Sequence, residues 1–262
     1  DDPDVIAALH PIADALAGAP ATEWWHTSLD LSLLRYTSRT ADEPPTPPSL
    51  TGAHGKLARW RAKAVEDEAR WAAHAPADPA ANVSGAWWST PVHTSLSTTT
   101  RALPGLGSIQ LAWEEDSFGQ PRGSIWSVEP TTPPSVLEID GPPAWTRLVE
   151  RYPLDVTYSR RHDWYRTTGR DGRWFIPDWA AVAADYDAVH VSVAGYLTTA
   201  TRALVLNDAT AATVLAGWSP DQTWWLTDTL KLATPHPQQW TIDADSGRWH
   251  VEPRGRSGQP GA

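Results

Sequence analysis

Two short motifs contain residue types that could bind a dinucleotide. Residues 34–38 read Leu-Arg-Tyr-Thr-Ser, and residues 85–91 read Gly-Ala-Trp-Trp-Ser-Thr-Pro. Each motif has the pattern of a β-strand that runs into a polar turn. A guanidinium can bind phosphate or ribose oxygens, and a serine hydroxyl is small enough to lie beside a nicotinamide ring. We therefore predict a cofactor-binding set of Arg35, Tyr36, Trp88 and Ser89.

The densest group of charged and aromatic residues lies at 160–166, which reads Arg-Arg-His-Asp-Trp-Tyr-Arg. We expect residues 160–173 to form a polar loop that turns at 169–172. Such a loop could simply be solvated, but its aromatic residues favour a role at the rim of a binding cleft, where arginines bind phosphate. The predicted substrate-loop residues are Arg160, Arg161, His162, Trp164 and Tyr165.

The composition limits the classes of chemistry. The chain has 262 residues and a formal net charge of -10, which disfavours broad binding to nucleic acid. It has no cysteine, which excludes disulfides and thiolate chemistry, and its nine histidines lack metal-ligand spacing, so we expect no stable metal site. Seventeen tryptophans against two phenylalanines are either core packing or stacking platforms for sugars or bases, and we interpret most of them as structural.

The element pattern predicts an α+β fold. We expect helices at 1–21, 56–74, 144–151 and 177–183. We expect strands at 24–36, 86–89, 108–114, 123–128, 135–139, 189–197, 214–218 and 223–227. There is no βαβ rhythm and no glycine-rich phosphate loop after a strand, which argues against Rossmann and P-loop folds. No apolar run approaches the roughly 20 residues of a membrane helix. We predict a single domain over 1–254, followed by a disordered tail at 255–262.

From residue 84 onward, the order of segments resembles a bacterial branch of the ADP-ribosyltransferase-fold superfamily. The resemblance is carried by residues 85–89, by a strand and helix over 135–152 and by a helix that leads into a strand over 176–191. It is also carried by a Gly-Trp-x-x-Asp motif formed by Gly217, Trp218 and Asp221. The motif at 35–38, before residue 84, fits the same pattern. The resemblance implies two small, mostly antiparallel sheets that form an NAD cleft, with an N-terminal helical portion. The lack of cysteine leaves the compartment open, so we expect a cytoplasmic or secreted bacterial protein with no transmembrane segment.

The resemblance also implies roles for individual residues. In this superfamily a first-strand arginine or histidine grips the nucleotide and a second-strand serine or tyrosine orients the nicotinamide ribose, which Arg35 and Ser89 fit by type and order. A later acid stabilises the ribose as the glycosidic bond breaks, but the matching strand carries His190 where an acid is expected, with Asp187 nearby. Strand alternation puts these two candidate catalytic residues on opposite faces, so only one of them can face the ligand.

The expected function is that of a mono-ADP-ribosyltransferase-like protein, which cleaves NAD as a substrate and transfers ADP-ribose to an unknown acceptor. The acceptor could be a protein, a nucleic acid or a small molecule. The missing acid motivates an alternative, a catalytically inactive module of the same fold that recognises a protein or nucleotide through a Trp-rich cleft. Carbohydrate recognition by exposed tryptophans is a third possibility that rests on composition alone.

Overall fold

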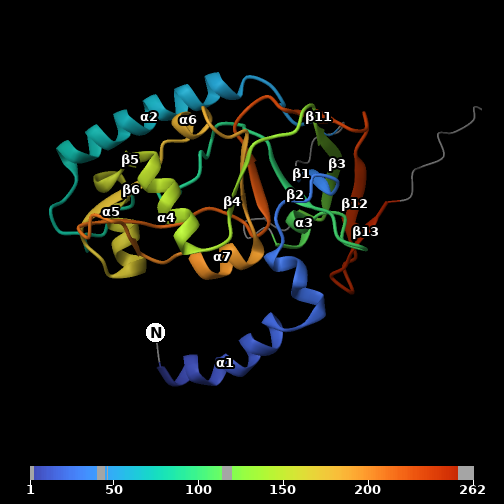
Figure 1. Cartoon of the computed structure of the whole chain (residues 1–262), viewed down its shortest axis with the longest axis horizontal. Coiled ribbons are helices and arrows are strands. Elements are labelled where there is room, and N and C mark those ends of the chain that lie inside the picture. The colour runs from blue at the N-terminus through green and yellow to red at the C-terminus, as the bar shows by residue number, and fades with distance from the viewer. Residues whose placement is uncertain (1–2, 40–44, 46, 114–119, 253–262) are drawn as a thin grey trace, which may run out of the picture.

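A computed structural model describes residues 3–39, 45, 47–113 and 120–252, and it contains two mixed sheets and several helices (Figure 1). The larger sheet has nine strands, of which eight form a continuous path. In spatial order they are β13 (Trp249–Val251), β12 (Gln238–Ile242), β3 (Arg122–Pro130), β1 (Leu34–Ser38), β2 (Thr98–Arg101), β10 (Gln222–Trp225), β7 (Ala188–Val191) and β4 (Val136–Ile139). The ninth, β11 (Leu230–Leu232), pairs with β3 off this path. All pairs are antiparallel except β4 with β7.

The smaller sheet has four strands. Their order is β5 (Pro153–Asp155), β6 (Arg173–Pro177), β9 (Ala211–Thr213) and β8 (Leu204–Val205). Only the pair β6–β9 is parallel. The α+β class is therefore confirmed, whereas the expectation of two small sheets is wrong for the larger one.

The helices surround these sheets. They are α1 (Pro3–Ala17), the 3-10 helix η1 (Pro20–His26), α2 (Ala53–His74), α3 (Ile109–Trp113), α4 (Pro142–Arg151), α5 (Thr157–Thr168), α6 (Trp179–Val182) and α7 (Val193–Thr199). The long helix α2 contains the expected helix at 56–74 and runs over α5 and α6 (Figure 1).

The most consequential correction concerns the expected polar loop at 160–173. These residues belong mainly to α5, followed by β6. Two local signals mark the ends of this helix: the Asp155 carboxylate accepts the Thr157 N–H before it, and Gly169 adopts φ 70° after it. An acid before the first turn and a glycine after the last are typical helix boundaries.

Other expected strands also differ. Residues 108–114 contain the helix α3 rather than a strand, and β7 ends at Val191 because Ser192 caps α7 by accepting the Gly195 N–H. No strand forms within 86–89 or 214–218, and only the end of 24–36 enters β1. The predicted tail at 255–262 lies outside the described residues.

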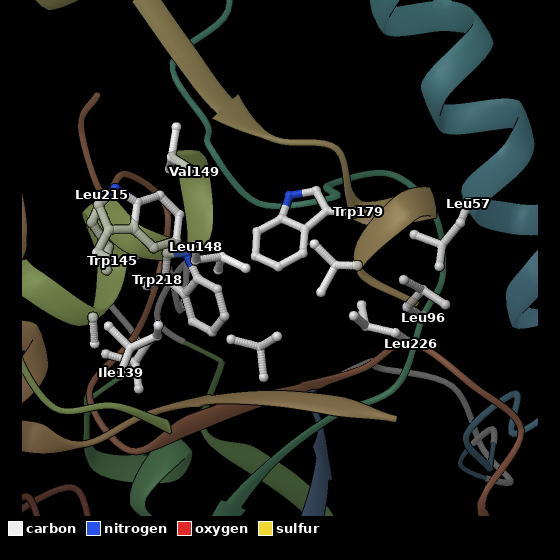
Figure 2. Packing of buried hydrophobic residues seen from close by; sticks show 14 of the residues in the cluster. Leu57, Leu96, Ile139, Trp145, Leu148, Val149, Trp179, Leu215, Trp218 and Leu226 are labelled. Carbon is white, nitrogen blue, oxygen red and sulfur yellow. The ribbon is translucent and has the colours of Figure 1, made fainter. Parts of the chain in front are cut away.

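A cluster of tryptophans fills the core between α4, α6 and the larger sheet (Figure 2). Trp145, Trp179 and Trp218 are buried, with ring centroids 6.0 to 6.4 Å apart. These tryptophans supply the volume that phenylalanine supplies in most cores. The structural interpretation therefore holds for these residues.

The N-terminal helix α1 projects from the rest of the protein (Figure 1) and buries none of its residues. It continues through Pro11 and ends at Ala17, within the expected helix at 1–21. Within the described ranges no single helix has the length and apolarity to cross a membrane, although α1 and η1, bent by 89° relative to each other, meet that criterion together.

Candidate ligand-binding pocket

The motif at 85–89 packs against α5, so two groups of residues predicted to bind ligand come together. Successive residues of the motif are hydrogen-bonded to the helix. The bonds are Gly85 N to Asp163 Oδ2 (2.6 Å), Ala86 N to Ser159 O (2.9 Å), Trp164 Nε1 to Trp87 O (2.9 Å) and Arg160 Nη2 to Trp88 O (3.1 Å). Glycine is required at 85 because a side-chain carbon there would collide with the Ser159 carbonyl.

Ser89 ends this motif with a structural role. Its side chain is buried, and its hydroxyl donates to Ala216 O (3.0 Å) and accepts from Ala216 N (2.9 Å). Its carbonyl accepts the indole N–H of Trp179 (2.8 Å). Both hydrogen bonds of the hydroxyl are therefore internal, whereas the prediction required an exposed hydroxyl beside a nicotinamide.

A cavity of about 540 Å³ lies between α2, the segment 85–95 and α5. Its charged lining consists of Lys56, Arg59, Lys63, Arg160 and a single acid, Asp67. Its aromatic lining consists of Trp60, Trp88 and His93. Four cations against one carboxylate form a positive region on a protein whose net charge is -10. We call this cavity the basic pocket.

Arg160 is the buried cation of the basic pocket. Its side chain donates to the Ser159 hydroxyl (2.9 Å) and to the Trp88 carbonyl, but its Nε has no partner and it forms no ion pair with any described carboxylate. Burial lowers the pKa of Arg160 to about 10, although the charges of nearby acids oppose this shift. A buried guanidinium without a directly bound anion is costly and would be stabilised by an anionic ligand.

The other cations come from one face of α2. Lys56, Arg59 and Lys63 recur at helical spacing and line the pocket, although none of them is among the residues predicted from the sequence to bind ligand. Lys56 donates to Ser95 O (2.9 Å), and Lys63 lies 3.1 Å from Asp67. Arg59 forms no hydrogen bond or ion pair with the part of the chain that the structure describes, so its guanidinium is available.

Trp88 forms an accessible aromatic wall of the pocket. Its side chain is 39% exposed, and its ring lies 5.7 Å from that of His93 in an edge-to-face arrangement. The other face of the indole packs on Gly217, where any side chain would collide with the ring. His93 and Ser95 adopt φ values of 62° and 56°, which non-glycine residues rarely do. Strained backbone of this kind is concentrated at ligand-binding loops.

The remaining residues of the predicted substrate loop serve the structure of α5. Arg161 forms a two-bond ion pair with Asp171 (2.9 Å each). His162 and Trp164 are buried, and His162 Nδ1 lies 3.1 Å from the Pro79 carbonyl. Tyr165 is half-buried on the same helix. Of the five predicted residues, only Arg160 lines the basic pocket.

Arg35 and Tyr36 lie elsewhere, on β1 near the centre of the larger sheet. Tyr36 packs against Trp126, with ring centroids 5.7 Å apart. Arg35 lines a different cavity, between β1, β3 and β12. Neither residue lines the basic pocket, so the predicted cofactor-binding set is divided among separate regions.

The two predicted catalytic residues are both held by internal bonds. Asp187 accepts the Ser135 N–H (2.9 Å) and the Thr227 hydroxyl (2.7 Å). His190 is buried, with Nδ1 2.6 Å from Glu138 Oε2 and Nε2 3.4 Å from Asp221 Oδ1. The network continues to Arg101, whose Nε donates to Asp221 Oδ1 (2.6 Å). We call Arg101, Glu138, His190 and Asp221 the buried charge network.

Comparisons of the chain with protein-family models, with curated proteins and with solved structures find no match. Within the described ranges, no group of three histidine or acidic side chains is arranged to hold a metal ion. The basic pocket is therefore the candidate functional site.

Proposed function

We propose that this chain binds a nucleotide in the basic pocket, with a phosphate at Arg160 and an aromatic ring against Trp88. NAD is the first ligand to test. Binding without cleavage is favoured because neither His190 nor Asp187 lines the pocket, and both are held by other side chains or backbone groups. This corresponds to the alternative of an inactive binding module.

The observation that carries the proposal is the buried, unpaired guanidinium of Arg160. A phosphate would supply the missing charge and accept charge-assisted hydrogen bonds. Lys56, Arg59 and Lys63 provide further positive charge, and together they would attract an anion despite the acidic surface elsewhere. The nearby acids Asp67, Glu68 and Asp163 stabilise the charged form of Arg160 and oppose an anion there, so the positive charge of α2 must outweigh them for a phosphate to bind.

The aromatic residues supply the second half of the recognition chemistry. Trp60 and Trp88 line the same cavity as the cations, and indole rings stack with bases and with nicotinamide. The volume of about 540 Å³ is within the range of small-molecule sites. A purely anionic ligand such as inorganic phosphate would leave these rings unused.

Isothermal titration of the full chain with NAD, ADP-ribose, AMP and inorganic phosphate tests the proposal. We expect saturable binding of at least one nucleotide and weaker binding of phosphate. Arg160→Met, which retains much of the buried volume, should raise the Kd about tenfold or more because a charge-assisted bond is lost. Arg161→Met is the matched control, since Arg161 lies on the same helix and pairs with Asp171 instead.

Arg59→Gln provides a variant that does not disturb buried packing, because Arg59 is exposed and unpaired with described residues. It should weaken nucleotide binding while the melting temperature stays the same. Absence of saturable binding at millimolar nucleotide, or an unchanged Kd in folded Arg160→Met, would contradict the proposal. Release of nicotinamide from NAD that disappears in Arg160→Met would instead favour the transferase with its unknown acceptor.

A further inference from the structure

A second cavity, of about 400 Å³, lies over the larger sheet between β1, β3 and the turn that joins β11 to β12. We propose that it binds a small monocarboxylate with an apolar body, and that Arg35 binds the carboxylate group. The site is separate from the basic pocket and does not depend on nucleotide binding there.

Strand register places the donor groups of this cavity on one face of the larger sheet. Arg35 on β1 is opposite Ser127 on β3, and Gln238 on β12 is opposite Ile125. Because side chains alternate along β3, those of residues 125 and 127 share a face, and their cross-strand partners share it with them. Three neighbouring strands therefore present Arg35, Ser127 and Gln238 to one cavity.

The acidic residue that borders this cavity, Glu252, has its carboxylate on the opposite face of the sheet. Gln239 is opposite Ser124, and the Glu252 N–H donates to Gln239 O (2.9 Å), so these three side chains share the face that Arg35 does not use. On that face Glu252 Oε1 lies 3.3 Å from Arg122 Nε. The carboxylate of Glu252 therefore does not compete with a ligand for Arg35.

Arg35 has unused hydrogen-bonding capacity. Its guanidinium carries five N–H donors, yet among the described residues its one hydrogen bond is from Nη1 to the neighbouring Leu34 carbonyl (2.8 Å), and it forms no ion pair. The side chain is partly buried, and burial lowers the pKa of Arg35. A carboxylate would satisfy the planar fork of donors with two parallel bonds.

Three uncharged side chains offer further donors. The Trp240 indole N–H donates to Gln238 Oε1 (3.0 Å), which fixes the amide oxygen and leaves the amide nitrogen as a donor. The Ala233 N–H donates to Ser127 O (2.9 Å), so the turn that carries His236 starts beside Ser127. Neither the Ser127 hydroxyl nor the His236 ring forms a hydrogen bond with the described part of the chain. An amide, a hydroxyl and an imidazole can therefore donate to a carboxylate in the cavity.

The charges and the apolar lining define the rest of the ligand. Arg35 is the one permanent cation among the described residues of the lining, so it balances a single negative charge. On the same face, Glu129 pairs with Lys231 (3.1 Å) and lies outside the lining. An amino acid would therefore leave its ammonium group without an anionic partner. Pro237 and Val251 also line the cavity, and Val251 is 40% exposed, which provides apolar surface for the body of the ligand.

Saturation-transfer NMR of the full chain with benzoate and with hexanoate, followed by titration of the stronger binder, tests the proposal. We expect saturable binding of this acid, and weaker binding of acetate, of succinate and of the neutral benzamide. Gln238→Glu should raise the Kd about tenfold or more, because the new carboxylate would pair with Arg35 and repel the ligand. Gln239→Glu is the matched control, since it makes the same charge change on the opposite face and should bind as wild type does.

Lack of saturable binding of both acids at millimolar concentration would overturn the proposal, as would equal Kd values for folded Gln238→Glu and Gln239→Glu. Equal affinity for benzamide would overturn the carboxylate assignment, and equal affinity for acetate would overturn the apolar body. Arg35→Gln should also weaken binding about tenfold or more. If Arg35→Gln folds poorly, the exposed Gln238→Glu still tests the site. NAD titration of Gln238→Glu should match wild type, which separates failure here from failure of the basic pocket.

Discussion

His190 and Glu138 are paired residues in the parallel register of β7 and β4, and His190 Nδ1 lies 2.6 Å from Glu138 Oε2. Glu138 also accepts the Leu29 N–H through Oε1 (2.9 Å). At the other end of the buried charge network, Arg101 donates to the Thr27 hydroxyl (2.7 Å). The network therefore fastens the segment after η1 to the larger sheet, and its charges balance when His190 is protonated.

Stability should fall as the pH rises through the pKa of His190. Burial disfavours the imidazolium, but hydrogen bonds and charges of Asp221 and Glu138 outweigh this and raise the pKa of His190 above its ordinary 6.5. A pKa that is higher in the folded state gives stabilisation that is complete below 6.5 and lost above the folded value. Urea unfolding between pH 5 and pH 9 measures this loss. His190→Gln should flatten the dependence of stability on pH, whereas His54→Gln, at an exposed residue, should retain it. Equal slopes for wild type and His190→Gln would contradict the prediction.

Arg101→Met should destabilise the protein by about 3–5 kcal/mol, because it removes the cation in direct contact with the buried Asp221 carboxylate and leaves only the more distant His190. Asp221 also adopts φ 59°, a strained conformation that its bonds to Arg101 help to hold. Chemical denaturation provides the measurement. Arg122→Met removes an exposed ion pair and should change stability by only about 0–1 kcal/mol. We also expect the double variant Arg101→Met/Asp221→Asn to be more stable than Arg101→Met alone, because it removes the unpaired carboxylate. If the stability losses of the two single variants simply add in the double variant, the pairing of Arg101 with Asp221 is contradicted.

Trp179→Ala should cost about 3–5 kcal/mol, since the residue is buried against Trp145 and Trp218 and donates to Ser89 O. The comparison is Trp113→Ala, because that side chain is 38% exposed and its removal opens a smaller cavity. Thermal denaturation of both variants tests the assignment. Equal melting temperatures for wild type and Trp179→Ala would show that this tryptophan is not a core residue.

Gly217→Ala should weaken nucleotide binding without altering any charge of the basic pocket. The added methyl group would displace the Trp88 ring that packs on this glycine. Gly247→Ala is a matched control, because both glycines have positive φ but the space around Gly247 is open. Isothermal titration with NAD should therefore give a raised Kd for Gly217→Ala and a wild-type Kd for Gly247→Ala. The same Kd in both variants would mean that the position of Trp88 is unimportant for binding.

Several local features follow from the sequence by itself. The α+β class and the long helix α2 follow from the spacing of apolar residues, and the lack of cysteine chemistry follows from composition. Trp88 and Arg160 are binding candidates by residue type alone, and both line the basic pocket. Such features depend on neighbours close in the chain, which the sequence displays directly.

The tertiary structure decided which charged groups are already paired. Arg160 and Arg161 are adjacent in sequence, yet one is buried without a carboxylate and the other pairs with Asp171. His190 meets Glu138 and Asp221 from distant parts of the chain through strand register. The reactivity of a charge depends on burial and on partners within a few ångströms, and spacing along the sequence does not specify these. The same limit applies to the basic face of α2, which forms a pocket only because α5 and the segment 85–95 pack beside it.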